Sequence, residues 1–278
     1  MGETPSGTES ASRVIDVLLL FTDGSAPLGV TRIARELGLS KAVVHRILQS
    51  LVSKGMLVPD GHRRGYRLGP AASTLGSRAL QDSDLRAAAI ELLRELRAVT
   101  GETTTLTALI PQGRIYLEQV PSPQEIRMTV EQGRRFPLHA GASGKCMLAL
   151  LPDGHREQVL AEPLPALTPQ TRTDPGALRA ELRQIRRSGF ATSTGERQPD
   201  AASVAAPVLG PNGAVLGAIS VCGPRYRLTR EVSETLAGRV VSTARAISYR
   251  MGAVDPELFT RAPQQAEAQQ AEAQQAEA

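Results

Sequence analysis

Residues 31–54 read TRIARELGLSKAVVHRILQSLVSK, a stretch in which two helical patterns meet at a turn. Gly38 suits the left-handed backbone conformation that ends a helix, and Ser40 is a favourable N-cap for the helix that follows. Apolar residues recur at helical spacing on both sides of the turn, at Ile33, Ala34 and Leu37 and then at Val44, Ile47, Leu48 and Leu51. The pattern predicts a helix–turn–helix whose second helix buries this apolar face.

The outer face of the second helix is polar and narrow, which favours contact with DNA. In a helix–turn–helix the second helix enters the major groove, where its N-terminal residues meet base edges and an arginine can donate two hydrogen bonds to one guanine. We predict that Arg46 makes this contact and that the small Ala42 touches a thymine methyl group. Thr31, a candidate N-cap of the first helix, and Lys41 are predicted to contact phosphates. The other DNA-binding residues predicted in this segment are Ser40, Val43, His45 and Gln49.

A glycine-rich basic turn follows, between two short apolar strands predicted at residues 56–58 and 66–68. Its tip, formed by His62, Arg63 and Arg64, is predicted to contact the DNA backbone or the minor groove. From residue 28 to residue 70 the chain holds eight Lys or Arg residues against two acidic ones, a formal charge of +6 in a chain of +4. A basic module attached to a slightly acidic remainder is typical of a protein that binds a polyanion. The alternative is that these cations simply form a solvated basic surface.

The length of 278 residues suits two domains, and the sequence period changes after residue 101. Segments 103–110, 114–120, 125–130, 203–209 and 214–221 are typical of strands, and segments 142–151, 175–189 and 230–251 of helices. This pattern predicts an α+β domain in which helices pack on one antiparallel sheet. The predicted organisation is a disordered N-terminus (1–9), a winged helix–turn–helix (10–70), a linker helix (71–83), an effector-binding domain (84–252) and a low-complexity tail with QQAEA repeats (253–278).

Several classes of protein are not supported by the sequence. No apolar run approaches the ~20 residues that span a bilayer, and the N-terminus does not resemble an export signal, so we expect a cytoplasmic protein without a membrane partner. The two cysteines, Cys146 and Cys222, are expected to be free thiols. The motif around Lys145 is not a phosphate-binding loop, because His139 stands where that loop requires glycine. No Cys/His pair has metal-ligand spacing and no nucleophile, base and orienting group can be placed together, so we expect no metal, no cofactor and no catalytic residue.

Three motifs together resemble the IclR family of bacterial transcription regulators. The first is RIARELGLSKAVVHRILQSLVSKGML followed by YRLG, which is similar to the DNA-binding half of that family. The second is FPLHAGASGKCMLALLP, which is similar to the signature that opens its effector-binding half. The third is GFATSTGERQPDAASVAAPVLGPNGAVLGAISVCGP, which resembles the family's glycine-led strand, acidic loop and hairpin. The resemblance extends from about Ser10 to Met251.

The resemblance implies an N-terminal winged helix–turn–helix, a linker helix and a GAF-like or profilin-like effector domain, assembled as a homodimer or homotetramer. It also implies a ligand pocket between the sheet and the loop that precedes the ASGK helix. The positions that match this pocket are Ile126, Thr129, Ala142, Ser143, Ser193, Ser203, Ser220 and Cys222. Hydroxyl groups and free N–H groups at a helix end can hold a carboxylate, which favours a small organic acid as effector; local hydrogen bonds to the backbone are the alternative role for these serines.

The sequence therefore predicts a repressor that binds a double-stranded operator and is controlled by a small organic effector. Two other functions stay open at this point. One is a small-molecule carrier or an enzyme whose winged helix contacts another protein, and the other is an architectural DNA-binding protein without a ligand.

Overall fold

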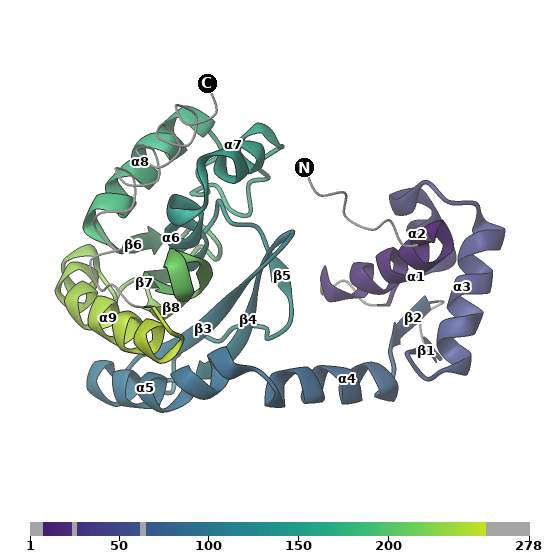
Figure 1. Cartoon of the computed structure of the whole chain (residues 1–278), viewed down its shortest axis with the longest axis horizontal. Helices are drawn as coiled ribbons and strands as arrows, with labels where there is room; N and C mark the ends of the chain where they lie inside the picture. Colours follow the sequence, from purple (N-terminus) through teal and green to yellow (C-terminus); the bar gives the residue numbers. More distant parts are fainter. Residues whose placement is uncertain (1–7, 24–26, 62–64, 254–278) are drawn as a thin grey trace, which may run out of the picture. The chain divides into compact units, whose positions relative to one another are not determined.

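The computed structural model describes residues 8–23, 27–61 and 65–253. The chain divides into two compact units, Met1–Ser83 and Asp84–Ala278, which carry the purple-to-blue and blue-to-yellow colours of Figure 1. The first unit is mainly helical and the second is built on a sheet. Each unit is described by itself.

The first unit has the element order of a winged helix–turn–helix, as predicted. Its elements are α1 (Glu9–Leu20), the 3-10 helix η1 (Phe21–Asp23), α2 (Val30–Leu37), α3 (Lys41–Ser53), β1 (Leu57–Asp60), β2 (Gly65–Leu68) and α4 (Pro70–Gln81). The strands β1 and β2 pair antiparallel. One core joins the three helices to the hairpin, with Val17, Ile33, Val44, Leu48 and Leu57 fully buried.

The turn between α2 and α3 forms through the residues that the sequence indicated. Gly38 has a φ of +64° and ends α2 in the left-handed conformation. The hydroxyl of Ser40 accepts a hydrogen bond from the Val43 N–H at 3.3 Å, so Ser40 caps α3. The prediction that Thr31 caps α2 was wrong, because the N-cap is Gly29 and the helix begins at Val30, two residues earlier than predicted. The reason is tertiary: Leu28 and Tyr66 exchange two backbone hydrogen bonds, which fix the chain just before α2.

The second unit is an α+β fold around a six-stranded antiparallel sheet in the order β5-β4-β3-β8-β7-β6. The strands are β3 (Thr103–Ile110), β4 (Gly113–Val120), β5 (Arg135–Phe136), β6 (Ala191–Thr194), β7 (Ala201–Leu209) and β8 (Val215–Pro224). The helices are α5 (Asp84–Thr100), α6 (Ala142–Leu150), α7 (Asp153–Ala161), α8 (Pro175–Ser188) and α9 (Arg230–Arg250), and the 3-10 helix η2 (Pro211–Gly213) joins β7 to β8. The predicted antiparallel sheet with packed helices is confirmed.

The helices cover both faces of the sheet (Figure 1). Val204 and Val221 point to one face, where they pack with α5 and α9. The alternate residues Ala205 and Ala218 point to the other face, where they pack with α6 and α8. Because strand residues alternate between faces, the polar residues Ser203 and Ser220 also lie on the α6 side.

One predicted strand does not form. Residues 125–130 adopt bends and irregular backbone rather than a strand. Side chains from the sheet satisfy the backbone of this segment instead: Gln119 bonds both the N–H and the C=O of Val130 at 3.0 Å, and Thr103 donates to the Met128 C=O at 2.7 Å. A β-rich composition therefore marks a segment that lies against the sheet without joining its ladder.

Within the described ranges, no helix is both long enough and apolar enough to cross a bilayer. Both cysteines are free and buried, as expected.

Candidate functional site

The first candidate site is the outer face of α3. Val44, Leu48 and Leu51 are buried against the core, which leaves the opposite side of the helix uncovered in this unit. Of the predicted DNA-contacting residues, Val43 is half-buried and the rest of the described ones are exposed: Thr31, Ser40, Lys41, Ala42, His45, Arg46 and Gln49. The exposed set combines cations, a hydroxyl, an amide and a small residue, which is the chemistry that contacts phosphates and base edges. His62, Arg63 and Arg64 lie outside the described residues.

The second candidate site is a small cavity in the second unit. It lies on the α6 side of the sheet and its floor is set by strand register. Ser203 on β7 pairs with both Ser193 on β6 and Cys222 on β8, so these three side chains form a row across the sheet. Ser220 stands beside this row on β8, and its hydroxyl lies 2.7 Å from that of Thr105. Antiparallel pairing thus brings together residues that are widely separated in the sequence.

Six of the eight predicted ligand residues line this cavity, namely Ala142, Ser143, Ser193, Ser203, Ser220 and Cys222. Ile126 and Thr129 do not line it. Both are exposed in the irregular segment that replaces the predicted strand, while Met128 between them lies at the cavity wall. The cavity has a free volume of about 30 Å³, which suits one or two water molecules.

The first turn of α6 forms one wall of the cavity. Gly141 precedes this helix with a φ of +82°, a backbone conformation that favours glycine. A helix leaves its first N–H groups without partners inside the helix. Here the Gly141 N–H donates to Glu196 Oε2 at 3.0 Å, and Ala142 and Ser143, the first two residues of α6, line the cavity.

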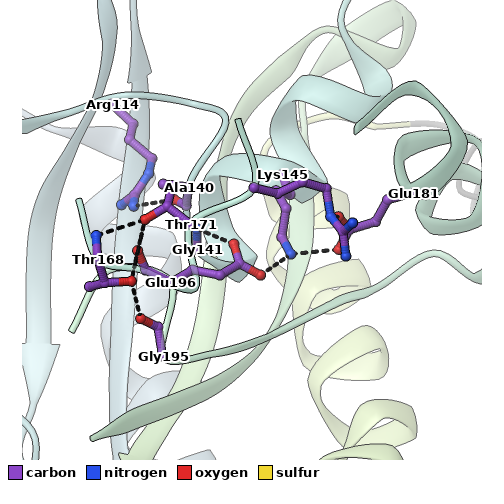
Figure 2. Close-up of polar contacts among 10 residues, drawn as sticks. Arg114, Ala140, Gly141, Lys145, Thr168, Thr171, Glu181, Gly195 and Glu196 are labelled. Carbon is purple, nitrogen blue, oxygen red and sulfur yellow. Dashed lines mark hydrogen bonds and ion pairs between the residues drawn. The ribbon is translucent and has the colours of Figure 1, made fainter. Parts of the chain in front are cut away.

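A buried ion pair holds α6 to the loop after β6 (Figure 2). Lys145 is only 1% exposed, and its ammonium group contacts Glu196 and, at 2.6 Å, Glu181 on α8. The backbone of the same loop is fixed by two threonines: Thr171 donates to the Glu196 C=O and Thr168 to the Gly195 C=O, each at 2.6 Å. The carboxylate of Glu196 thus connects its own loop to the Gly141 N–H at the start of α6 and to the Lys145 side chain on that helix.

Two arginines, which sequence reasoning missed, supply the cavity's charge. Arg114 on β4 is 1% exposed, donates to the Ala140 C=O at 3.1 Å and lies over the rings of Tyr116 and Phe136. Arg197, the residue after Glu196, lies over the same two rings. The described residues that line the cavity include both arginines and no Asp or Glu. The cavity is therefore suited to a negatively charged or strongly polar ligand.

The thiols do not change this charge. Burial raises the pKa of Cys222, at the cavity floor, to about 12, and it raises the pKa of Cys146 on α6 to about 12 as well. Both groups are therefore protonated at neutral pH. A buried thiol with so high a pKa is a poor nucleophile.

A larger cavity of about 520 Å³ lies elsewhere in the second unit, beside α7, the β3–β4 turn and the segment 163–165. It contains none of the predicted ligand residues, and proline and leucine form much of its wall. His139 lines this cavity and donates a hydrogen bond from Nε2 to the Pro165 C=O at 2.9 Å. The C=O of its neighbour Ala140 accepts a hydrogen bond from Arg114. We take the smaller cavity as the candidate ligand site because polar groups converge there. No group of three His, Cys, Asp or Glu side chains in the described part of the chain is arranged to hold a metal ion.

Comparison with known proteins decides the family. The model of the IclR helix-turn-helix domain matches residues 10–61, and the model of the bacterial transcriptional regulator IclR C-terminal domain matches residues 77–249. The chain belongs to the IclR family. It is accordingly a transcription regulator with a DNA-binding helix–turn–helix and a C-terminal ligand-binding domain, and its relatives are regulators rather than enzymes.

Individual IclR proteins resemble the chain over most of its length. The HTH-type transcriptional regulator BhcR of Paracoccus denitrificans is 34% identical over 250 residues, which are 90% of this chain and 89% of BhcR. An IclR transcriptional regulator from Silicibacter sp. TM1040 has a similar structure, with a TM-score of 0.79, 33% identity and coverage of 88% and 97% of the two chains. An IclR homologue from Microbacterium hydrocarbonoxydans, solved with 4-hydroxybenzoate, has a TM-score of 0.68, 28% identity and coverage of 87% and 99%.

The buried ion pair leads to a first prediction, on stability. Lys145→Met should destabilise this IclR protein by about 3 kcal/mol or more, because Glu196 would remain buried without its cation. Urea unfolding of the full chain, followed by circular dichroism, measures the change. Arg179→Met is the control, since its ion pair with Glu157 lies on the surface and such pairs contribute little. Similar unfolding midpoints for the two variants would contradict a structural role for the buried pair.

A second prediction concerns pH. Burial lowers the pKa of His139 below its usual value of about 6.5. The unfolded chain therefore binds this proton first as the pH falls, so the stability contributed by neutral His139 is present above pH ~6.5 and is lost below it. His139→Gln should remove this part of the pH dependence, measured as the thermal midpoint between pH 5 and pH 7. Equal slopes in the wild type and in His139→Gln would refute the assignment.

Proposed function

We propose that the chain is a repressor that reads its operator with α3 and changes its affinity for DNA when a small organic acid binds in the cavity beside α6. Residues 10–70 would form the DNA-binding domain, 71–83 the linker and 84–252 the effector-binding domain. The observation that carries the proposal is the presence of an exposed polar face on α3 together with a small cavity in the other unit that is lined by two arginines and by no Asp or Glu among the described residues.

The DNA-binding part rests on the division of α3 into two faces. The buried side anchors the helix, and the exposed side offers Arg46 with Ala42 one turn earlier. When a helix lies in the major groove, two residues that are one turn apart on its outer side point toward neighbouring base pairs. Lys41 at the helix start and the sequence-predicted basic tip at His62, Arg63 and Arg64 would add phosphate contacts.

The effector part rests on the lining of the cavity. Serine residues, two arginines and the first two residues of α6 line it, and hydroxyl, guanidinium and helix-terminal N–H groups are donors for a carboxylate. The IclR homologue solved with 4-hydroxybenzoate, itself a carboxylate, supports an organic acid as the class of effector. A ligand changes operator affinity only by the difference in its affinity for the DNA-binding and the non-binding states.

We further propose that the protein acts as a symmetric homodimer or homotetramer, because paired half-sites in an operator require paired recognition helices. The first unit carries apolar side chains that its own core does not cover. Ile15 on α1 is 55% exposed and Leu75 on α4 is 62% exposed. Helix α4 buries none of its residues, so it is a candidate for the contact between copies.

Sequence readout gives a third prediction. Arg46→Ala should relax the preference for operator over random duplex by roughly tenfold or more, since a bidentate arginine–guanine contact accounts for about 1–3 kcal/mol of discrimination. Arg64→Ala should weaken binding to both duplexes alike and reduce the salt dependence. The measurement is fluorescence anisotropy at several salt concentrations, on an operator obtained by sequencing the genomic DNA that the purified protein retains. An equal loss of preference in both variants would refute the assignment of Arg46.

Effector control is tested on the same operator. Lactate, succinate and 4-hydroxybenzoate are titrated into the protein–operator complex, and the anisotropy reports the fraction bound. We expect at least one acid to lower operator affinity and to raise the thermal midpoint of the free protein, because a ligand stabilises the state that binds it. If none of the acids changes either quantity, control by an organic acid is wrong.

A further inference from the structure

Arg114 is the least satisfied charged group in the described part of the chain. Of its three guanidinium nitrogens, only Nη2 has a protein acceptor, the Ala140 C=O. Nε and Nη1 are buried and have no hydrogen-bond partner among the described residues. A buried donor without an acceptor costs about 1–3 kcal/mol, and more when it is charged. A protein retains such a group where something else supplies the acceptor.

The carboxylates described near this site are already paired. The nearby carboxylate of Glu196 is already bonded to Lys145 and to the Gly141 N–H. Glu102, close to Cys222, forms an ion pair with Arg227. The guanidinium carbon lies 5.2 Å from the Tyr116 ring centroid and 5.3 Å from that of Phe136. The faces of these rings stabilise the cation. They do not replace the full-strength hydrogen-bond acceptors that Nε and Nη1 lack.

The donors around the cavity complete an anion site. Arg114 and Ser143 both line the cavity, and α6, a helix of nine residues, begins beside them. The positive end of the helix dipole adds to the charge of Arg114. Arg197 lies over the same two rings at 5.6 Å and 5.3 Å, and one of its N–H groups bonds Gln198 at 3.1 Å.

We propose that Arg114 determines the charge of the effector by binding its carboxylate through Nε and Nη1, with the first N–H groups of α6 as further donors. Arg197, which is half-buried at the edge of the cavity, closes over the bound acid. This inference rests on the proposed function, since it assumes that the cavity is the effector site. The free volume of about 30 Å³ holds only one or two water molecules, so an organic acid enters the cavity only if side chains at its wall, such as Arg197 or Met128, move.

The test compares acids with their neutral amides. Lactate, succinate and 4-hydroxybenzoate are paired with lactamide, succinamide and 4-hydroxybenzamide, which match the acids in shape but carry no charge. Calorimetric titration of the full chain should give tighter binding for at least one acid than for its amide. In Arg114→Met, the acid should bind roughly ten- to hundredfold more weakly, as expected for a lost charged hydrogen bond, while the amide should bind about as before.

Two further variants separate binding from folding. Arg134→Met is the matched control, because Arg134 lies over the same Phe136 ring at 5.2 Å but pairs with Glu131 on the surface and does not line the cavity; it should bind the acid like the wild type. Arg114→Lys keeps a cation without the planar fork, so it should still prefer acid to amide, with reduced affinity. This variant serves as the test if Arg114→Met does not fold, as judged by its thermal midpoint.

The outcomes distinguish the inference from the proposed function. If an acid lowers operator affinity but binds to Arg114→Met as tightly as it binds to the wild type, Arg114 does not determine the charge of the effector. The proposal of effector control would then still hold. The same conclusion follows if the wild type binds an amide as tightly as its acid. If none of the six compounds binds and none changes operator affinity, effector control by an organic acid fails, and this inference fails with it.

Discussion

The buried contact between Lys145 and Glu196 is the interaction on which the cavity depends. Removing two charges from water is costly, so such a pair persists only where both partners are held in place and their other hydrogen-bonding groups are satisfied. Here the Lys145 ammonium group also donates a hydrogen bond to Glu181, and the Gly141 N–H donates to the second carboxylate oxygen of Glu196. Thr168 and Thr171 fix the backbone beneath Glu196. The loop that carries Arg197 and the helix start that carries Ser143 are therefore fixed relative to each other by one carboxylate.

The local structure was predictable where short-range physical rules decide it. Gly38 and Ser40 define the turn before α3 because a left-handed residue and an N-cap depend only on their immediate neighbours. The sheet was predictable for a similar reason, since alternating patterns and turn residues between β7 and β8 specify a hairpin. Thr31 was misplaced as a cap because the start of α2 depends on Leu28, which is held by Tyr66 of the distant hairpin. Segment 125–130 was wrongly predicted to be a strand, because a β-rich composition is also found in segments that pack against a sheet without hydrogen bonding to it as a strand.

The site was only partly predictable, and the gap has a physical cause. The family resemblance predicted six residues of the cavity wall. It predicted neither the position of Arg114 nor the ion pair between Lys145 and Glu196. Lys145 and Glu196 are 51 residues apart, and an isolated lysine or arginine in a sequence is most often exposed. The residues next to Arg114 in the sequence do not reveal that two aromatic rings and the glycine-containing start of α6 form a space for its side chain. Gly144 is part of that room, because a Cβ at this position would lie 3.0 Å from Arg114 Nε and 2.5 Å from the Leu138 C=O.

The position of Arg114 also bears on how a bound acid would be sensed. Its Nη2 holds the Ala140 C=O, one residue before the left-handed Gly141 and two before α6 begins. Arg114 lines the cavity, so in the proposed complex an anion at Nε and Nη1 and the loop at Nη2 would share one rigid planar group. If an acid binds as proposed, a shift of that plane toward it would move Ala140 and the start of α6 that follows it. Since the Gly141 N–H donates to Glu196, the acidic loop would follow the same displacement. In this proposal, ligand binding and the geometry of the α6 start would be coupled through adjacent hydrogen bonds within one domain, without a long chain of contacts.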